Sequence, residues 1–231
     1  MLDELSFLKE IPDPLAGAPV TPAPAPRFSA PSAPRSQTQR RRLAALGISL
    51  GWLCTHLVVF GIRSDFARLP AEYVAAQIVL PALLGAASLL LAVAPGKLGL
   101  GLAVSIVAGL AVLGPISFWL CAGLLNTPYP AADDLLRSGR LWPGVLVCLD
   151  LTLAWAAAPL LLAALTLRRA FPAGAGWRSG LVGAALGLLS GAAINLHCSN
   201  VNQGHMLLGH GIPIVVAALV GGLVVSRWAR A

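Results

Sequence analysis

The stretch VAAQIVLPALLGAASLLLAVA (residues 74–94) is followed by Pro95-Gly96-Lys97 and then by LGLGLAVSIVAGLAVLGPISFWL (residues 98–120). Each apolar run has the roughly 20 residues that an α-helix needs to cross the hydrocarbon layer of a membrane. The three residues between the runs leave room only for a tight turn. We therefore expect two antiparallel transmembrane helices here.

The rest of the chain repeats this pattern. Of its 231 residues, 57% are hydrophobic and 11% are charged, whereas about 25% of the residues in a soluble domain are charged. The remaining apolar runs cover residues 43–62, 143–167, 179–197 and 207–226. We therefore predict an all-α, polytopic membrane protein whose six transmembrane helices form one lipid-embedded domain, residues 43–231.

The basic residues predict the orientation of this domain. The net charge of +7 comes from side chains that gather at the ends of the apolar runs, so it does not indicate a nucleic-acid partner. On one side of the predicted membrane lie only Arg63, Arg68, Arg137 and Arg140, and the rest of the 16 Lys and Arg residues lie on the other. The positive-inside rule places the richer side in the cytoplasm. We expect a multi-pass protein of the cell inner membrane with both termini cytoplasmic.

The predicted cytoplasmic tail, residues 1–42, has two parts. Residues 14–39 form a proline-rich linker that we expect to be disordered. Residues 2–13 are acidic and carry apolar side chains at a roughly three-residue spacing. The alternative for this segment is a terminus without a binding role. The candidate anchors for a protein partner are Leu2, Leu5, Phe7, Leu8 and Ile11.

Four residues near the outer ends of the last two predicted helices have soft or borderline metal-ligand side chains: His197, Cys198, His205 and His210. They are candidates for a sensing or metal site that takes Zn or Cu. The alternative is capping and interfacial hydrogen bonding, with no cofactor. Five residues separate His205 from His210, which is about 140° around an α-helix. In a regular helix the two side chains would therefore not point the same way.

Three further features are ambiguous. Cys121 and Cys198 both end helices on the outer side, so they are candidates for a disulfide, with packed thiols as the alternative. Asp150 is an intramembrane acid that fits either a structural hydrogen bond or an ion pathway. Gly183, Gly187 and Gly191 form a stripe suited to close helix packing, and they leave homodimerisation open.

The sequence contains no phosphate-binding loop, nucleophile elbow, zinc-protease motif or dinucleotide fingerprint, so we do not expect an enzyme. Several local features appear in a characteristic order. They are Arg40-Arg41-Arg42, Gly61-Ile62-Arg63-Ser64-Asp65, the glycine-rich fifth run ending in Leu196-His197-Cys198, the turn from His205 to His210, and a chain end just after Arg227 and Arg230. In this order they resemble the NrsF-type membrane-bound anti-sigma factors, the negative regulators of sigma F.

The resemblance implies a function for the tail. Residues 2–13 would sequester an extracytoplasmic-function-type sigma factor, and a membrane or periplasmic signal would release it to regulate transcription. The competing interpretation is a small transporter or a metal- or redox-handling membrane protein built on Asp150 and the outer His and Cys residues. The richness of the tail in proline departs from the family pattern and leaves the identity of the sigma factor open.

Overall fold

The computed structural model describes residues 35–93, 104–124, 141–167 and 175–230. Every regular element within these ranges is helical. The long helices are α1 (Arg35–Phe60), α3 (Leu80–Val93), α4 (Val104–Leu124), α6 (Leu141–Thr166) and α7 (Ala175–His197). The last predicted span is built from α8 (Gln203–His205), a π-helical segment (Met206–Gly211), α9 (Ile212–Val220), a second π-helical segment (Gly221–Val225) and α10 (Ser226–Arg230). A 3₁₀ turn (Phe66–Arg68), α2 (Ala71–Val74) and a π-helical segment (Ala75–Val79) lead from α1 into α3.

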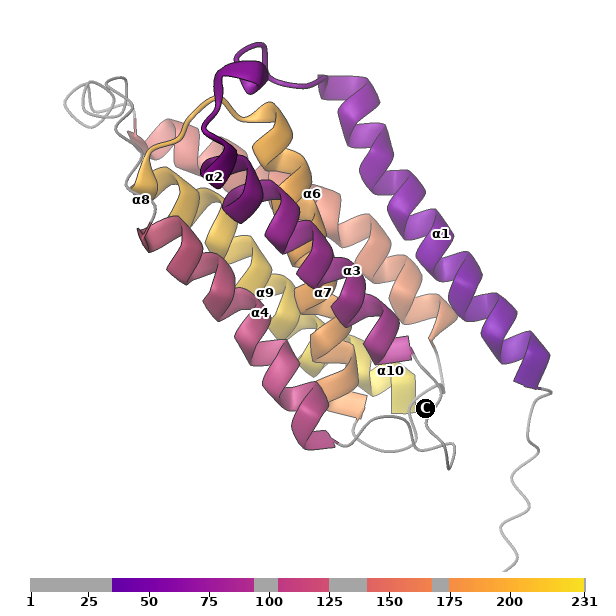
Figure 1. Ribbon diagram of the computed structural model, residues 1–231. Coiled ribbons are helices and arrows are strands. Elements are labelled where there is room, and N and C mark those ends of the chain that lie inside the picture. Colours follow the sequence, from indigo (N-terminus) through magenta and orange to yellow (C-terminus); the bar gives the residue numbers. More distant parts are fainter. Residues whose placement is uncertain (1–34, 94–103, 125–140, 168–174, 231) are drawn as a thin grey trace, which may run out of the picture. The chain divides into compact units, whose positions relative to one another are not determined.

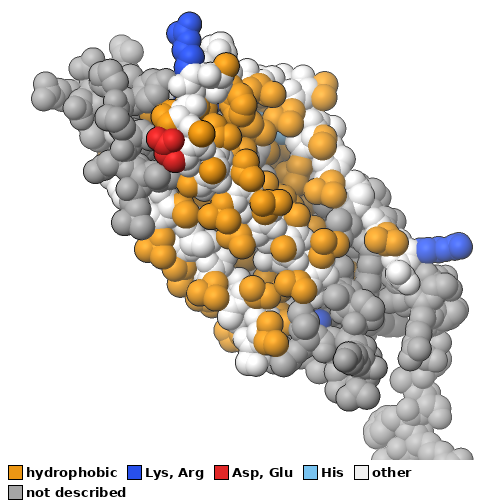
Figure 2. Space-filling view, in the orientation of Figure 1, with side chains coloured by type: hydrophobic (Ala, Val, Ile, Leu, Met, Phe, Trp, Pro, Cys, Tyr) orange, Lys and Arg blue, Asp and Glu red, His pale blue; other side chains and the backbone are white. Residues whose placement is uncertain are grey.

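The described residues contain five helices that are long and apolar enough to cross a membrane. A sixth apolar stretch, Leu50–Phe60 in α1, is shorter. This confirms the predicted all-α membrane architecture. The helix that contains this stretch begins earlier, at Arg35, because Arg and Gln are good helix formers and the helix continues beyond its apolar part. Hydrophobic side chains cover most of the face shown in Figure 2, and the coloured charged side chains lie toward its ends.

The centre of the bundle is α7. Within its most apolar window 94% of the residues are buried, against 28–44% in the other four candidate spans. It packs against α3, α4, α6 and α9 (Figure 1). Lipid is as apolar as a helix surface, so helices in a membrane associate through close packing. The small side chains of α7 permit such packing on all its sides.

Glycine allows α7 and α9 to approach most closely. A Cβ atom at Gly183 would overlap the carbonyl oxygen of Ala217, and one at Gly187 would lie 2.8 Å from the Cα atom of Ile214. At Gly191 the added carbon would make ordinary contacts, 3.6 Å from the Ile214 side chain and 4.0 Å from the His210 carbonyl oxygen. The predicted glycine stripe therefore lies at the contact between α7 and α9.

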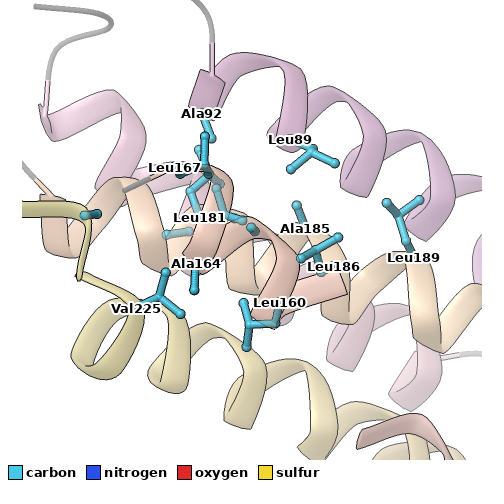
Figure 3. Close-up of a cluster of buried hydrophobic side chains, with 14 of the residues drawn as sticks. Leu89, Ala92, Leu160, Ala164, Leu167, Leu181, Ala185, Leu186, Leu189 and Val225 are labelled. Carbon is cyan, nitrogen blue, oxygen red and sulfur yellow. The ribbon is translucent and has the colours of Figure 1, made fainter. Parts of the chain in front are cut away.

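Leucine, alanine and valine fill the larger part of the core, on the other sides of α7. Figure 3 shows leucine and alanine side chains of α3, α6 and α7 meeting around Leu181 and Leu186, with Val225 from the last span beside them. Leu53 of α1 also belongs to this cluster. Among the described side chains of α1, Leu53 and His56 are the buried ones, so α1 contacts the bundle along one narrow stripe.

The N-terminal end of α1 and the C-terminal end of α10 lie at the same end of the bundle (Figure 1). At the opposite end lie the loop that follows α1 and the loop between α7 and α8. The candidate functional residues gather around this second pair of loops.

Candidate thiol–imidazole site

Two thiols and two imidazoles converge at the end of the bundle that carries these loops. Cys148 belongs to α6, Cys198 follows α7, His205 ends α8, and His210 lies in the π-helical segment Met206–Gly211. Their potential ligand atoms all lie within 4.8 Å of one another. Residues from three separate parts of the chain therefore form one site, which we call the thiol–imidazole site.

The distances within the site are short. The Sγ atoms of Cys148 and Cys198 are 3.6 Å apart, and Cys198 Sγ lies 3.3 Å from His205 Nε2. The two histidine Nε2 atoms are 3.2 Å apart. His205 is 1% exposed and His210 is fully buried, so water has little access to their rings. Neither Nδ1 atom has a hydrogen-bond partner among the described residues.

The loop between α7 and α8 is shaped by asparagines. Asn202 caps α8 by accepting a hydrogen bond on Oδ1 from the backbone N–H of His205, at 3.2 Å. Asn200 Oδ1 accepts one from the backbone N–H of Asn202, at 2.9 Å. An asparagine cap satisfies a backbone donor that a helix start otherwise leaves unpaired. These bonds fix the direction in which the His205 ring leaves the loop.

A π-helical turn explains how two histidines five residues apart face each other. The expected 140° separation assumed a regular α-helix, and the structure corrects this assumption. In the segment Met206–Gly211 the hydrogen bonds connect residues i and i+5, so side chains with this spacing lie one above the other. Pro213 lies two residues after this segment and lacks an N–H, and in an α-helix its ring would clash with the carbonyl of residue 209. The wider turn avoids this clash.

The four donors match a tetrahedral metal site in type, and three of the six distances among them are close to tetrahedral edges. Zn–S bonds of about 2.3 Å and Zn–N bonds of about 2.0–2.1 Å give tetrahedral edges of about 3.8 Å for S–S, 3.6 Å for S–N and 3.3 Å for N–N. The corresponding distances here are 3.6, 3.3 and 3.2 Å. Two thiolates and two imidazoles are also a donor set that Zn²⁺ and Cu⁺ prefer. The residues present therefore fit such an ion.

The sequence-predicted candidates separate into two groups. Cys198, His205 and His210 lie together in the thiol–imidazole site. His197 instead faces α1, with its ring 5.9 Å from that of His56 and 5.3 Å from that of Phe60. The four cysteines are free, and Cys198 lies beside Cys148 without a bond to Cys121.

Sequence reasoning missed Cys148 as a member of the site, because Cys148 and Cys198 are 50 residues apart in the sequence and meet only in the folded chain. Asp150 is exposed on α6, and within the described part of the chain no hydrogen bond or ion pair involves it. The proposed partner-binding residues, Leu2, Leu5, Phe7, Leu8 and Ile11, lie outside the described residues.

Arg63 forms a second assembly directly against this site. Its side chain is 1% exposed and makes a fork of two hydrogen bonds to Asp65, Nε to Oδ1 at 2.6 Å and Nη2 to Oδ2 at 2.7 Å. The hydrogen bonds that the Arg63 guanidinium donates hold the pKa of the Asp65 carboxyl below its ordinary value. The same guanidinium donates to the backbone oxygens of Cys198 and Ser199, at 2.6 and 3.1 Å. We call this assembly the Arg63 bracket.

The fold and the site define a class: a polytopic helical membrane protein with a buried thiol–imidazole site at one end. The family model described as "Negative regulator of sigma F" (NrsF) matches residues 28–230, nearly the whole chain. The chain therefore belongs to this family, as the resemblance in its sequence predicted. Membership places it among regulators of transcription whose partner is a sigma factor. Neither the curated proteins nor the solved structures contain a match.

Proposed function

We propose that the chain is an inner-membrane anti-sigma factor that holds an extracytoplasmic-function-type sigma factor through residues 2–13 and releases it when a stimulus acts on the thiol–imidazole site. The observation that carries this proposal is the family match over residues 28–230. The matched region begins after the acidic, apolar segment, so capture by that segment rests on its own sequence.

The topology supports different roles for the two ends of the bundle, sigma-factor capture at one end and reception of the stimulus at the other. The Lys and Arg distribution favours cytoplasmic termini, and the start of α1 and the end of α10 lie at one end (Figure 1). The thiol–imidazole site lies at the other end, which this orientation places toward the periplasm. The tail thus faces the compartment of the sigma factor, and the site faces the outside.

The chemistry of the tail suits capture of a protein. A short amphipathic segment folds into an apolar groove on binding, with anchors at helical spacing. The proline-rich linker would keep the captured sigma factor close to the membrane surface and at a high local concentration. The partner is therefore a protein, and no direct contact with nucleic acid is needed.

Charge substitutions in the tail test the mode of capture. Leu5→Asp together with Leu8→Asp should release a tagged sigma factor from the membrane fraction and raise transcription of its target promoter, because buried anchors become charged. The matched control is Ser29→Asp with Ser32→Asp, which adds the same charge to the linker and should leave capture intact. Membrane-bound sigma factor in the Leu5/Leu8 variant would refute capture by this segment.

The stimulus that fits the site best is a soft or borderline metal ion such as Zn²⁺ or Cu⁺. The supporting observation is the convergence of two thiols and two imidazoles within 4.8 Å of one another, with three of their distances close to tetrahedral edges. Binding would require loss of the thiol protons and would replace the direct contact between Cys198 and His205 by bonds to the ion. The loop between α7 and α8 would then change position.

Metal titration of the purified full chain tests this stimulus. Wild type should bind one Zn²⁺ per chain, and Cys198→Ser or His210→Ala should lose it. Cys54→Ser and His56→Ala are matched controls that change the same residue types outside the site. Equal binding by all five proteins would exclude the site. Transport of the ion by proteoliposomes that contain the wild-type chain would instead favour a transporter.

A further inference from the structure

The proposed function needs a connection between the thiol–imidazole site and α1, because α1 follows the tail in the chain. The structure contains one buried polar link between them, within the described residues. It starts at Cys198, whose thiol belongs to the site while its carbonyl oxygen accepts a hydrogen bond from Arg63. A single residue thus takes part in both assemblies.

Arg63 caps the C-terminal end of α7. Its backbone N–H donates to Leu196 O at 2.9 Å, and its guanidinium donates to the carbonyl oxygens of Cys198 and Ser199. The last carbonyls of a helix have no intrahelical partner, and a cation is favourable beside them. Arg63 therefore ties the loop after α1 to the end of the central helix.

The connection from Arg63 back to α1 is short. Gly61 ends the helix with a φ of +73°, and its N–H donates to Leu57 O at 3.0 Å, which is a left-handed helix cap. Only Ile62 separates this cap from Arg63. A displacement of Arg63 by more than a small amount must therefore move the end of α1.

The other ring contacts of this end of α1 are with the end of α7 and with α6. The rings of His56 and Phe60 pack on His197, the residue before Cys198. One turn earlier, Trp52 lies against Trp155 of α6, with ring centroids 4.8 Å apart. Because α1 is otherwise attached by a narrow stripe, its position depends on residues 196–199 and on Trp155.

We infer that Arg63 is the positioning residue that transmits occupation of the thiol–imidazole site to α1. When the four ligands close on an ion, the Cys198 thiol moves, and the carbonyl of the same residue carries Arg63 and the end of α1 with it. This inference rests on the proposed function for its input, a metal ion at the site. Lysine cannot replace Arg63 here, because it lacks the planar fork that binds Asp65 and two carbonyls together.

The test follows α1 directly by ¹⁹F NMR on the purified full chain that carries 5-fluorotryptophan. Trp52→Phe identifies the Trp52 signal, and Zn²⁺ is the probe. Wild type should show a Zn²⁺-dependent shift of this signal. In Arg63→Ala the shift should be at least threefold smaller, although the variant still binds one Zn²⁺. Arg68→Ala removes an exposed arginine of the same loop and should respond like wild type.

Three results would overturn the inference. They are a Trp52 signal that does not change with Zn²⁺ in wild type, a full shift in Arg63→Ala, and an Arg63→Ala chain that is folded but binds no Zn²⁺. Asp65→Asn provides a second variant should Arg63→Ala not fold, and its shift should be reduced as well. No sigma factor is present in this experiment. Failure of coupling is therefore distinguishable from failure of capture, which the tail variants report.

Discussion

Cys198 combines two roles because its side chain and its main chain point to different partners. The thiol lies beside Cys148 and His205, and the carbonyl oxygen lies on Arg63. A substitution that removes only the thiol, such as Cys198→Ser, should therefore disturb ligand binding and leave the Arg63 bracket in place. In the proposed function, this one residue would receive the signal through its side chain and transmit it through its main chain.

The ion pair in the bracket has a defined pH dependence. Hydrogen bonds from Arg63 lower the pKa of Asp65 below its ordinary value of 3.8. The stabilisation that the carboxylate gives is therefore complete above that value, and it is lost as the pH falls through the lowered pKa of the folded state. Asp65 contributes at neutral pH and stops contributing only in acid.

Thermal unfolding in detergent checks this dependence. Wild type should unfold at a higher temperature than Asp65→Asn near neutral pH, and the difference should vanish as the pH falls through the lowered pKa of Asp65. Glu72→Gln, which removes an exposed carboxylate outside the bracket, is the control and should differ little from wild type throughout. A difference between wild type and Asp65→Asn that persists in strong acid would contradict the role assigned to this ion pair.

At the scale of elements, the π-helical turn before Pro213 is the feature that completes the site. Alanine at this position restores the N–H and removes the ring, so the turn should relax toward an α-helix and rotate His205 and His210 apart. We expect Pro213→Ala to weaken Zn²⁺ binding roughly 10–100-fold, as when groups that orient metal ligands are lost. Isothermal titration measures the affinity.

Pro159→Ala is the matched control, because Pro159 lies inside α6 and takes no part in the site. It should leave the Zn²⁺ affinity unchanged. Unaltered binding by Pro213→Ala would show that the two histidines face each other for another reason.

The contact between α7 and α9 makes a second prediction for the elements. Gly187→Ala places a carbon 2.8 Å from the Ile214 backbone, where the helices cannot yield without separating. Overpacking of this kind costs about 1–3 kcal/mol. The control, Gly191→Ala, adds the same methyl group at an ordinary contact of 3.6 Å with a side chain. A lower melting temperature for Gly187→Ala alone is the expected result, and equal melting temperatures would argue against close packing there.

Hydropathy and spacing predicted most of the elements but only part of the site. Apolar runs predict the transmembrane helices because the thickness of the membrane sets the length of such helices. The same patterns say nothing about which helix is central, because α7 is buried through its small side chains. The sequence did not predict the complete site for two reasons. Cys148 meets Cys198 only through tertiary packing, and a π turn changes the helical periodicity from which the directions of His205 and His210 were predicted. The pairing of Arg63 with backbone oxygens has no signature in the sequence.

At the scale of the whole molecule, the orientation in the membrane is the prediction on which the proposed function depends. Green fluorescent protein fused after Ala231 should fluoresce, because it folds in the cytoplasm and not when exported by the general secretory route. Alkaline phosphatase inserted after Ser64 should be active, because it matures in the periplasm. The opposite pair of results would place the tail in the periplasm and rule out capture of a sigma factor.

The burial of α7 also bears on how a cell makes this protein. The ribosome delivers α3, α4 and α6 to the bilayer before α7, the helix around which they pack. A nascent chain that has not yet reached Ala175 therefore holds three spans without their common partner. Cys198, His205 and His210 are synthesised later still. Under the proposed function, each new molecule would complete its capture tail first and its stimulus site last, so it would be able to hold a sigma factor before it could release one.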